Sequence, residues 1–223
     1  GRFYEIGHVF YGQLDEERSV LPLEVQELAI GLYGEGNDFF TLKGILVHLC
    51  RHLGLPELDF QRETNHPSFH PGRCANAYVG DQLLGTLGEI HPQVAANYDL
   101  TGERAVLAEI NGETLLGLAK VQPLYQSLPR YPAIVRDLAV VMDMNVPVKA
   151  IENIILRQGG DLVESCQLFD VYQGSQVGEG RKSVAYTVTF RHPERTLKDR
   201  EVNQLYDAIV HEMKEQLNAV LRA

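Results

Sequence analysis

The stretch from Val163 to Val202 predicts two strands joined by a glycine-rich turn and followed by the start of a helix, and apolar and polar residues alternate along the second strand with few exceptions. The first predicted strand ends in the run LFDVY at residues 168–172, and the second extends from Ser183 to Phe190. Three glycines lie between them. Because successive side chains of a strand point to opposite faces, the alternation indicates a sheet with one buried face and one outward face.

The residues on either side of this hairpin complete the order β, α, β, β, α. Asp137–Asp143 has the pattern of a strand, and Pro147–Gln158 has that of a helix that begins with proline and ends before two glycines. We expect Thr196 to cap the last helix, with Asp199 at its third position as in a capping box. A short terminal strand at or beyond Leu221 then completes a ferredoxin-like βαββαβ plan.

The front half of the chain changes between strand and helix periods. Apolar residues recur at helical spacing from Phe39 to Leu53, and Gly54 follows as a helix terminator. The remaining segments have the period of strands, and His91-Pro92 is expected to end one of them, because proline cannot continue a ladder. The predicted strands are the run around Phe3–Phe10, then, after an acidic turn at Asp15, Glu16 and Glu17, Glu27–Tyr33, His66–Val79, the run LLGTLGEI and Arg104–Ile110. The pattern predicts an α+β fold built on an antiparallel sheet.

A proline-rich segment separates the two halves. The run KVQPLYQSLPRYP at residues 120–132 holds three prolines between periodic segments and predicts an extended linker. We therefore expect two domains, at residues 1–122 and 130–223.

The strands of the second domain can be sorted into two faces. We expect the helices to cover one face, made of Leu138, Val140, Met142, Phe169, Val171, Val184, Tyr186, Val188 and Phe190. The opposite, open face then holds Asp137, Ala139, Val141, Asp170, Tyr172, Ser183, Ala185 and Thr187. Small residues let a flat ligand approach the backbone and a tyrosine offers a stacking surface, as on sheets that bind single-stranded RNA. The alternative is that this face packs against another domain.

Composition places the chain among soluble globular proteins. It has 223 residues, 44% hydrophobic and 22% charged, and no apolar run approaches the roughly 20 residues that span a bilayer. The chain opens on Gly1 without an initiator methionine, so we expect a piece of a longer protein. Its three cysteines are far apart and form no CxxC pair, which favours the reducing cytoplasm.

Charge is distributed unevenly. The formal net charge is −10, with 17 acidic and 8 basic residues up to Pro129 but 13 and 12 from Arg130 onward. Nucleic-acid binding needs clustered basic residues, so the front half is expected to repel RNA or to face another protein. Basic residues cluster only in the back half, at Arg181, Lys182, Arg191, Arg195, Lys198 and Arg200.

Several runs resemble a known family. RYPAIVRDLAVVMD, LFDVYQG, RKSVAYTVTF and RTLKDREV resemble the ferredoxin-fold anticodon-binding domain at the C-terminus of bacterial phenylalanyl-tRNA synthetase β subunits. FYEIGHVFYG, FFTLKGIL, FHPGRCA and LGEIHPQV are similar to the class II synthetase-like core of the same subunits. The matches follow the family's order over nearly the whole chain.

The resemblance implies a part of an α2β2 enzyme that joins phenylalanine to its tRNA with ATP and Mg. Catalysis would belong to the α subunit, so this piece is expected to be non-catalytic, to hold no cofactor or metal, and to bind tRNA(Phe) in the cytoplasm. The sequence has no phosphate-binding loop, and we do not expect Arg2 or Arg73 to lie beside acidic partners. Carried over by position, Tyr172 matches the tyrosine on which an anticodon base stacks, and Ala139 and Ser183 match neighbouring contacts.

Further contact residues follow from their chemistry. The carboxylates of Asp137 and Asp170 can accept hydrogen bonds from base amino groups. Basic side chains near the hairpin and the helix start are candidates for phosphate contacts, although Arg195 is as readily expected to pair with Asp199 or Glu201. The basic candidates are Arg136, Arg181, Lys182, Arg195 and Lys198. A structural or regulatory ferredoxin-like module without RNA binding remains the alternative function.

Overall fold

The computed structural model describes residues 1–12, 21–100, 102–120 and 128–222, so the predicted acidic turn at Asp15–Glu17 and most of the proline-rich linker lie outside the described residues. The chain divides into two compact units, residues 1–125 and 126–223, and each is considered by itself. Within the described ranges, no helix combines the length and apolar character needed to cross a membrane.

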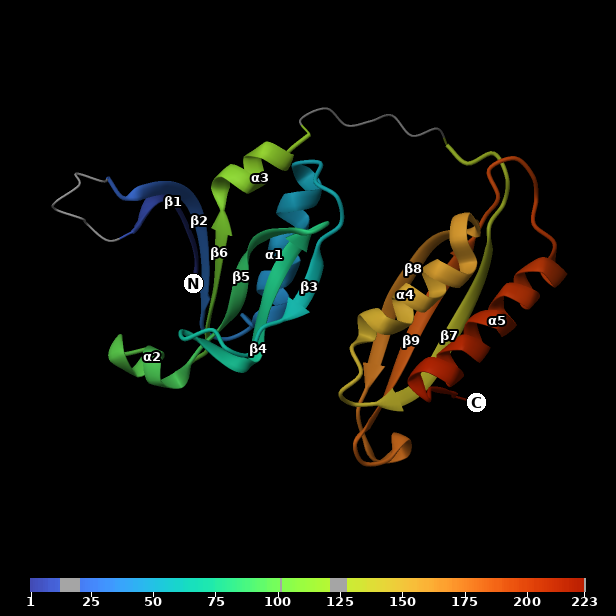
Figure 1. Cartoon of the computed structure of the whole chain (residues 1–223). Coiled ribbons are helices and arrows are strands. Elements are labelled where there is room, and N and C mark those ends of the chain that lie inside the picture. Colours follow the sequence, from blue (N-terminus) through green and yellow to red (C-terminus); the bar gives the residue numbers. More distant parts are fainter. Residues whose placement is uncertain (13–20, 101, 121–127, 223) are drawn as a thin grey trace. The chain divides into compact units, whose positions relative to one another are not determined.

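Unit 1 is built on an antiparallel sheet of six strands in the order β1-β2-β6-β5-β4-β3 (Figure 1). All five neighbouring pairs are antiparallel, as the sequence predicts. The strands are β1 (Arg2–Tyr11), β2 (Leu23–Tyr33), β3 (Asp59–Arg62), β4 (Phe69–Val79), β5 (Gln82–Ile90) and β6 (Ala105–Asn111).

Helix α1 (Phe39–His52) covers part of this sheet and confirms the helical period predicted there. Asp38 caps its first turn, because the carboxylate accepts a hydrogen bond of 2.7 Å from the backbone N–H of Thr41. Gly54, at φ +72°, follows the helix in a conformation that glycine adopts without strain. The buried side chains of α1 are Leu42, Leu46 and Cys50, which pack on Leu28, Ile30 and Leu32 of β2.

Three short elements of unit 1 were not predicted. Strand β3 has four residues, too few to show a period. Helix α2 (Pro92–Asn97) begins where the sequence predicts only a stop, because a proline that cannot extend a strand is well suited to the first turn of a helix. Helix α3 (Gly112–Leu118) is capped by Asn111, whose side-chain oxygen accepts from the N–H of Thr114.

Unit 2 has a four-stranded antiparallel sheet in the order β10-β7-β9-β8. Its elements are β7 (Ile134–Asp143), α4 (Val148–Gly159), β8 (Val163–Tyr172), β9 (Arg181–Phe190), α5 (Asp199–Leu217) and β10 (Val220–Leu221), with short 3-10 turns at Gly160–Leu162 and Ser175–Val177. The first and third strands are central and the short last strand lies at an edge, which is the predicted ferredoxin-like plan.

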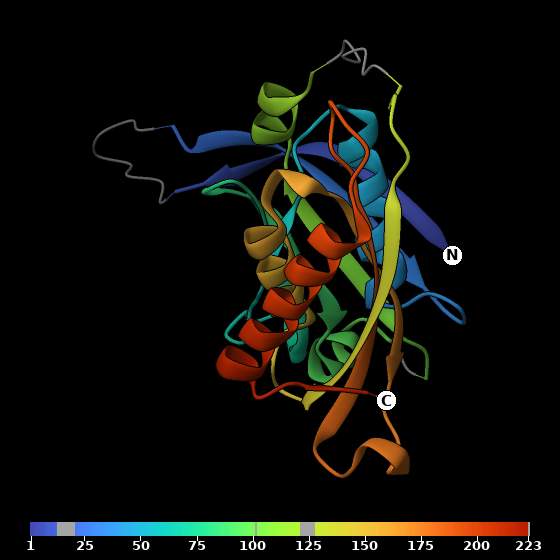
Figure 2. The ribbon, with the colours of Figure 1, turned by 90° about the vertical axis from the view of Figure 1, so that its right-hand side faces the viewer.

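Helices α4 and α5 lie side by side on one face of this sheet (Figure 2). Their buried side chains, among them Ile151 and Ile155 of α4 and Ile209 of α5, form one cluster with the strand residues. The predicted core residues Leu138, Val140, Met142, Val184, Tyr186, Val188 and Phe190 all belong to it. The second core of the protein therefore lies between the sheet and these two helices.

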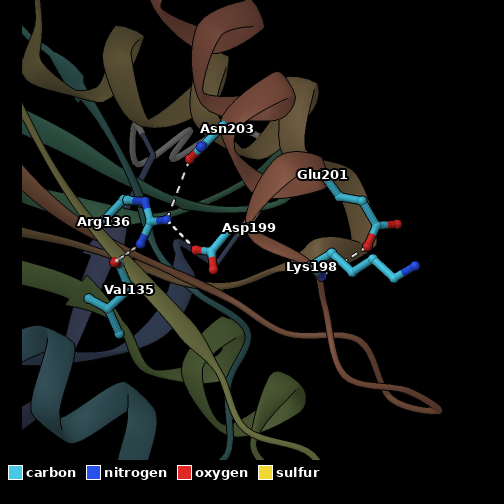
Figure 3. A network of polar contacts seen from close by, with 6 residues as sticks. All are labelled: Val135, Arg136, Lys198, Asp199, Glu201 and Asn203. Atoms are coloured by element: carbon cyan, nitrogen blue, oxygen red, sulfur yellow. Dashed lines mark hydrogen bonds and ion pairs between the residues drawn. The ribbon is translucent and has the colours of Figure 1, made fainter.

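Three local expectations for unit 2 were wrong. Helix α5 starts at Asp199, and its cap is Lys198 rather than Thr196. Glu201, rather than Asp199, occupies the third position of the helix, where its carboxylate accepts a hydrogen bond of 3.0 Å from the N–H of Lys198 (Figure 3).

Phe169 and Val171 of β8 are not core residues, although both were predicted to be. A register shift between Leu168 and Asp170 leaves Phe169 without a cross-strand partner and 60% exposed. Val171 lies across from the buried Val184 but is itself 41% exposed and lies outside the core cluster.

Candidate nucleic-acid interface

The register of β7, β8 and β9 determines which side chains share the face opposite the helices. Tyr172 lies directly across from Ser183, and Ser183 is paired on its other side with Val141. Asp170 and Ala139 are both paired with Ala185. Directly opposite residues of neighbouring strands point to the same face, so Tyr172, Ser183, Ala139 and Asp170 share one surface.

Arg222 lies across this surface. Its backbone N–H donates to the carbonyl of Ala139 at 2.9 Å, and its guanidinium carbon lies 5.5 Å from the centre of the Tyr172 ring. Its two terminal nitrogens approach Ser183 Oγ at 3.4 Å and Gln176 Oε1 at 3.5 Å. The long distances indicate weak contacts, so the guanidinium is held near the ring without being fixed there.

The face is less open than expected. Ser183 is only 3% exposed and Ala185 only 7%, since neighbouring side chains on three strands and Arg222 surround them. Tyr172 packs against Gly174, where a Cβ atom would lie 2.7 Å from the Cζ atom of the ring. A side chain at position 174 would collide with the Tyr172 ring, so glycine at this position allows the ring to lie where it does on the face.

Asp137 contributes a second polar group further along β7. Thr187 Oγ1 donates to its carboxylate at 2.8 Å from the adjacent position on β9, and the hydroxyl of Tyr206 approaches its backbone carbonyl at 3.3 Å. The Asp137 carboxylate thus accepts one hydrogen bond from the protein. Because the residue is exposed, its other lone pairs can accept hydrogen bonds from a ligand.

Lys182 is occupied by the protein itself. It is 7% exposed, and its ammonium donates to the backbone carbonyls of Met144 at 3.0 Å and Val146 at 2.7 Å. Burial lowers the pKa of this amine from its ordinary value, while the charge of Asp143 opposes the shift. The visible role of Lys182 is to hold the loop between β7 and α4.

Arg136 also has protein partners. It donates from β7 to Asp199 at 2.7 Å and to Asn203 at 3.4 Å, and so connects the strand to the first turn of α5 (Figure 3). Arg181 donates to the carbonyl of Val141 at 3.2 Å.

Arg195 forms a two-pronged ion pair with Glu201, with nitrogen–oxygen distances of 2.9 and 2.7 Å. The hydrogen bonds from Arg195 lower the pKa of the Glu201 carboxyl to about 2, and the N–H of Lys198 contributes to the same shift. The structure therefore groups the predicted face residues together, whereas it shows most of the predicted basic residues in internal contacts.

Sequence reasoning missed Arg222 and Gln176. The predicted terminal strand offered one signal: a strand ending at Leu221 beside β7 places the next residue level with Ala139, at the edge of the face. Gln176 lies in the turn after β8, whose conformation has no periodic pattern to predict it.

In unit 1, Arg73 lies beside an acidic partner, contrary to the expectation from the sequence. Its guanidinium lies 2.6 Å from the carboxylate of Glu89, which is 9% exposed, and Arg104 lies 4.0 Å from the same carboxylate. The acidic partner lies sixteen residues further on, on the neighbouring strand, where only the pairing of β4 with β5 brings the two together. Across the described part of the chain, no three His, Cys, Asp or Glu side chains come close enough to hold a metal ion.

These observations define the class of the protein. Unit 2 has a ferredoxin-like sheet whose free face carries a tyrosine, a serine and an arginine, and residues 129–222 match the family described as the ferredoxin-fold anticodon binding domain. The second unit of the chain thus has the fold of the ferredoxin-fold anticodon binding domain family.

The preceding unit specifies the family. Residues 1–112 match the phenylalanyl tRNA synthetase beta chain CLM domain. The chain belongs to the phenylalanyl-tRNA synthetase beta chain family, and the resemblance inferred from the sequence is confirmed.

Curated relatives agree with this assignment. The chain is 45% identical over 221 residues to the phenylalanine–tRNA ligase beta subunit of Clostridium tetani, and 39% identical over 221 residues to that of Clostridium acetobutylicum; both alignments cover 99% of this chain and 27% of the relative. The chain thus spans about a quarter of the length of these relatives. A solved pyrrolysyl tRNA synthetase from Desulfitobacterium hafniense aligns with a TM-score of 0.41 at 18% identity, over 57% of this chain and 46% of that chain.

Proposed function

We propose that this chain forms part of the β subunit of a phenylalanine–tRNA ligase and that its second domain binds the anticodon region of tRNA(Phe). The observation that carries the proposal is the arrangement of Tyr172, Ser183 and Arg222 on the face opposite the helices, within the unit that matches an anticodon-binding family. We assign the two roles to residues 1–122, a catalytic-like core without activity, and 130–223, the RNA-binding domain.

The chemistry of the face suits unpaired bases. A base has a π-face that stacks on tyrosine, and such stacking contributes about 1–3 kcal/mol. Asp170 and Asp137 supply acceptors for base amino groups, and the small side chain of Ala139 lets a base approach the sheet. Arg222 supplies a positive charge on the same face, near Tyr172 and Ser183, which offsets the repulsion of phosphates by these carboxylates.

Affinity for tRNA also needs phosphate contacts. Arg136 and Arg195 stay predicted contacts, although each is now engaged by protein groups, whereas the buried ammonium of Lys182 is held by two backbone carbonyls and is the predicted contact least available to a phosphate. Lys198 and Arg200, at the start of α5, are exposed and lie on the same helix end as Arg195. We assign the outer phosphate contacts to this end of the domain and the base contacts to the sheet face.

The remaining assignments concern the whole enzyme. In this proposal the subunit works in the cytoplasm with a catalytic α subunit in an α2β2 assembly, which uses ATP and Mg to charge tRNA with phenylalanine. Unit 1 supports the α subunit, and its acidic surface keeps the RNA on unit 2. A structural or regulatory module without RNA binding is the other candidate, and the match of unit 2 to an anticodon-binding family favours the RNA-binding role.

A competition experiment tests the proposal. Labelled tRNA(Phe) is bound to the protein at about 50 mM salt, where phosphate contacts are strong, and challenged with a hairpin of the anticodon stem and loop or with a hairpin of the acceptor stem. We expect the anticodon hairpin to compete and the acceptor hairpin to compete at least tenfold less well. No affinity at low salt, or equal competition by the two hairpins, would contradict the proposal.

A further inference from the structure

The face of the unit 2 sheet opposite the helices extends well beyond Tyr172. Strand β9 is paired with β8 on one side and with β7 on the other, so each outward residue of β9 lies in a row of three neighbours across the sheet. Four such rows follow one another, formed by Tyr172, Ser183 and Val141, by Asp170, Ala185 and Ala139, by Gln167, Thr187 and Asp137, and by Ser165, Thr189 and Val135. The proposed stacking tyrosine occupies only the first row.

The third and fourth rows are more open than the first two. Ser183 and Ala185, the central residues of the first two rows, are only 3% and 7% exposed. Thr187 and Thr189, at the equivalent positions of β9, are partly accessible, and Val135 beside Thr189 is 51% exposed. Hydroxyl and methyl groups of small side chains therefore form a floor that a flat ligand can approach.

Two longer polar side chains stand on either side of Thr187. Gln167 of β8 and Asp137 of β7 are its direct neighbours in the sheet, and both are exposed. Neighbouring strands lie about 4.8 Å apart, so the backbones that carry these two side chains are about 10 Å apart. This separation leaves space for one base between the two side chains.

Both side chains keep free hydrogen-bonding capacity. Within the described part of the chain, the Gln167 amide has no hydrogen-bond partner, and the Asp137 carboxylate accepts one hydrogen bond, from Thr187 Oγ1 at 2.8 Å. An amide offers a donor and an acceptor side by side, whereas a carboxylate only accepts. The third row thus presents a donor–acceptor pair on one side and an acceptor on the other.

Adenine matches this arrangement better than the other three bases. A glutamine amide donates to N7 of adenine and accepts one N6 hydrogen, and the second N6 hydrogen can bond to a carboxylate. Cytosine offers an amino group on a single ring, so it covers less of the floor and ranks second. Guanine presents two acceptors, N7 and O6, where the amide needs a donor and an acceptor, and uracil has no amino group for the carboxylate.

We propose that Gln167 and Asp137 form a second base subsite on this face, which takes an unpaired adenine over Thr187. The subsite rests on the RNA-binding role proposed for unit 2 and specifies it further. Ser183 and Thr187 are separated along β9 by about 13 Å at the rise of a strand, which is more than one base spans. The adenine is therefore a different nucleotide from the one that stacks on Tyr172.

Modified anticodon hairpins test the subsite in the holoenzyme. Each adenine of the hairpin loop is replaced in turn by purine, which lacks only the 6-amino group, and the affinity is measured at about 50 mM salt. We expect one of these replacements to weaken binding by about 5- to 150-fold, the range for a bidentate contact with a base. In the double variant Gln167→Leu, Asp137→Ala the same replacement should change the affinity less than twofold, because both partners of the amino group are gone.

Two control variants separate this effect from other losses. Gln204→Leu removes an exposed glutamine from α5, on the other side of the sheet, and should keep the wild-type sensitivity to purine. Tyr172→Ala should weaken binding of every hairpin but keep the sensitivity at the same loop position, since that position belongs to the other subsite. The single variants Gln167→Leu and Asp137→Ala should each show a reduced sensitivity, and they decide the question if the double variant does not fold.

Three results would overturn the subsite while leaving the RNA-binding proposal in place. One is a hairpin that binds equally well with purine at every adenine position, and another is equal sensitivity of the wild type and the double variant. The third is loss of the sensitivity in Tyr172→Ala, which would assign Gln167 and Tyr172 to the same base. A hairpin that does not bind even unmodified would contradict the RNA-binding role itself, and the subsite with it.

Discussion

The guanidinium carbon of Arg222 lies 5.5 Å from the centre of the Tyr172 ring, so the second-last residue of the chain lies over the proposed stacking tyrosine. A cation near an exposed aromatic ring contributes about 0.5–1 kcal/mol, whereas base stacking contributes about 1–3 kcal/mol. A base can therefore displace the guanidinium from the ring at a net gain. The hydrogen bonds from the Arg222 guanidinium to Ser183 and Gln176 are long and therefore weak, so they oppose its movement away from the ring only slightly.

Replacing the ring is the direct test of stacking. We expect Tyr172→Ala to weaken tRNA(Phe) binding by about 5- to 150-fold, which corresponds to the loss of about 1–3 kcal/mol. Tyr172→Phe keeps the ring and should bind within about twofold of the wild type. In the holoenzyme, aminoacylation should decrease with Tyr172→Ala while activation of phenylalanine with ATP is unchanged. Equal loss of both activities would indicate a different role for Tyr172.

The charge of Arg222 is tested by salt dependence. If the guanidinium contacts RNA after it leaves the ring, Arg222→Ala removes one positive charge and should reduce the slope of log K against log salt by about 0.7–0.9. Arg222→Lys keeps the charge and should keep the slope. Titrations between about 50 and 200 mM salt measure it. Tighter binding by Arg222→Ala would instead show that the arginine only competes with the base for Tyr172.

Lys182 is predicted to affect folding more than RNA binding. Lys182→Met retains a flexible stem but leaves the carbonyls of Met144 and Val146 without their donor, which should lower the free energy of unfolding of unit 2 by about 1–3 kcal/mol. Urea denaturation monitored on unit 2 measures this loss. The salt slope of tRNA binding, measured where the variant is folded, should not change. A reduced slope with unchanged stability would restore Lys182 as a phosphate contact.

The periodic features of the sequence predicted most of the fold. Alternation along β9 and helical spacing in α1, α4 and α5 follow from burial on one face, and burial depends on residue type. The elements that were missed, such as β3 and α2, are short, and their position depends on neighbours rather than on their own period. The error at Phe169 has a similar origin, because an unpaired residue in β8 interrupts strict alternation and no residue type signals it.

The residues that share the sheet face were predictable from strand periodicity, whereas the hydrogen-bond partners of most basic residues were not. Strand periodicity alone placed Tyr172 and Ser183 on one face, and the structure pairs them directly. For Arg195 the sequence offered a phosphate contact and a pair with Asp199 or Glu201 as equal expectations, and the pair with Glu201 is present. By contrast, Arg136 and Lys182 were expected only to contact phosphates. Their partners, Asp199 and two loop carbonyls, become neighbours only in the folded structure, which side-chain charge does not reveal.

The ion pair at the start of α5 predicts a dependence of stability on acid. Because Arg195 and the N–H of Lys198 lower the pKa of Glu201 to about 2 from 4.5, its contribution is fully present above about pH 4.5 and is lost as pH falls toward 2. We expect Glu201→Gln to reduce the loss of unit 2 stability over this window, measured as melting temperature at several pH values. Glu215→Gln, at an exposed position of the same helix, should leave the wild-type profile unchanged. Identical profiles for Glu201→Gln and the wild type would contradict the assigned pair.

Two glycines of unit 1 are predicted to respond in opposite directions to alanine. In β5, a Cβ atom on Gly85 would lie 2.8 Å from the Cα of Ile110 on the neighbouring strand, so the two backbones are too close for a side chain. Gly85→Ala should therefore destabilise unit 1 by about 1–3 kcal/mol.

Gly44 lies in the middle of α1 with no atom within 4 Å of the added Cβ, and its flexibility in the unfolded chain disfavours the helix. Gly44→Ala should stabilise unit 1 by about 0.5–1 kcal/mol. Hydrogen exchange of slow amides in α1 and β5 reports these changes separately from unit 2, and a destabilising Gly44→Ala would show that α1 packs more closely there than the structure indicates.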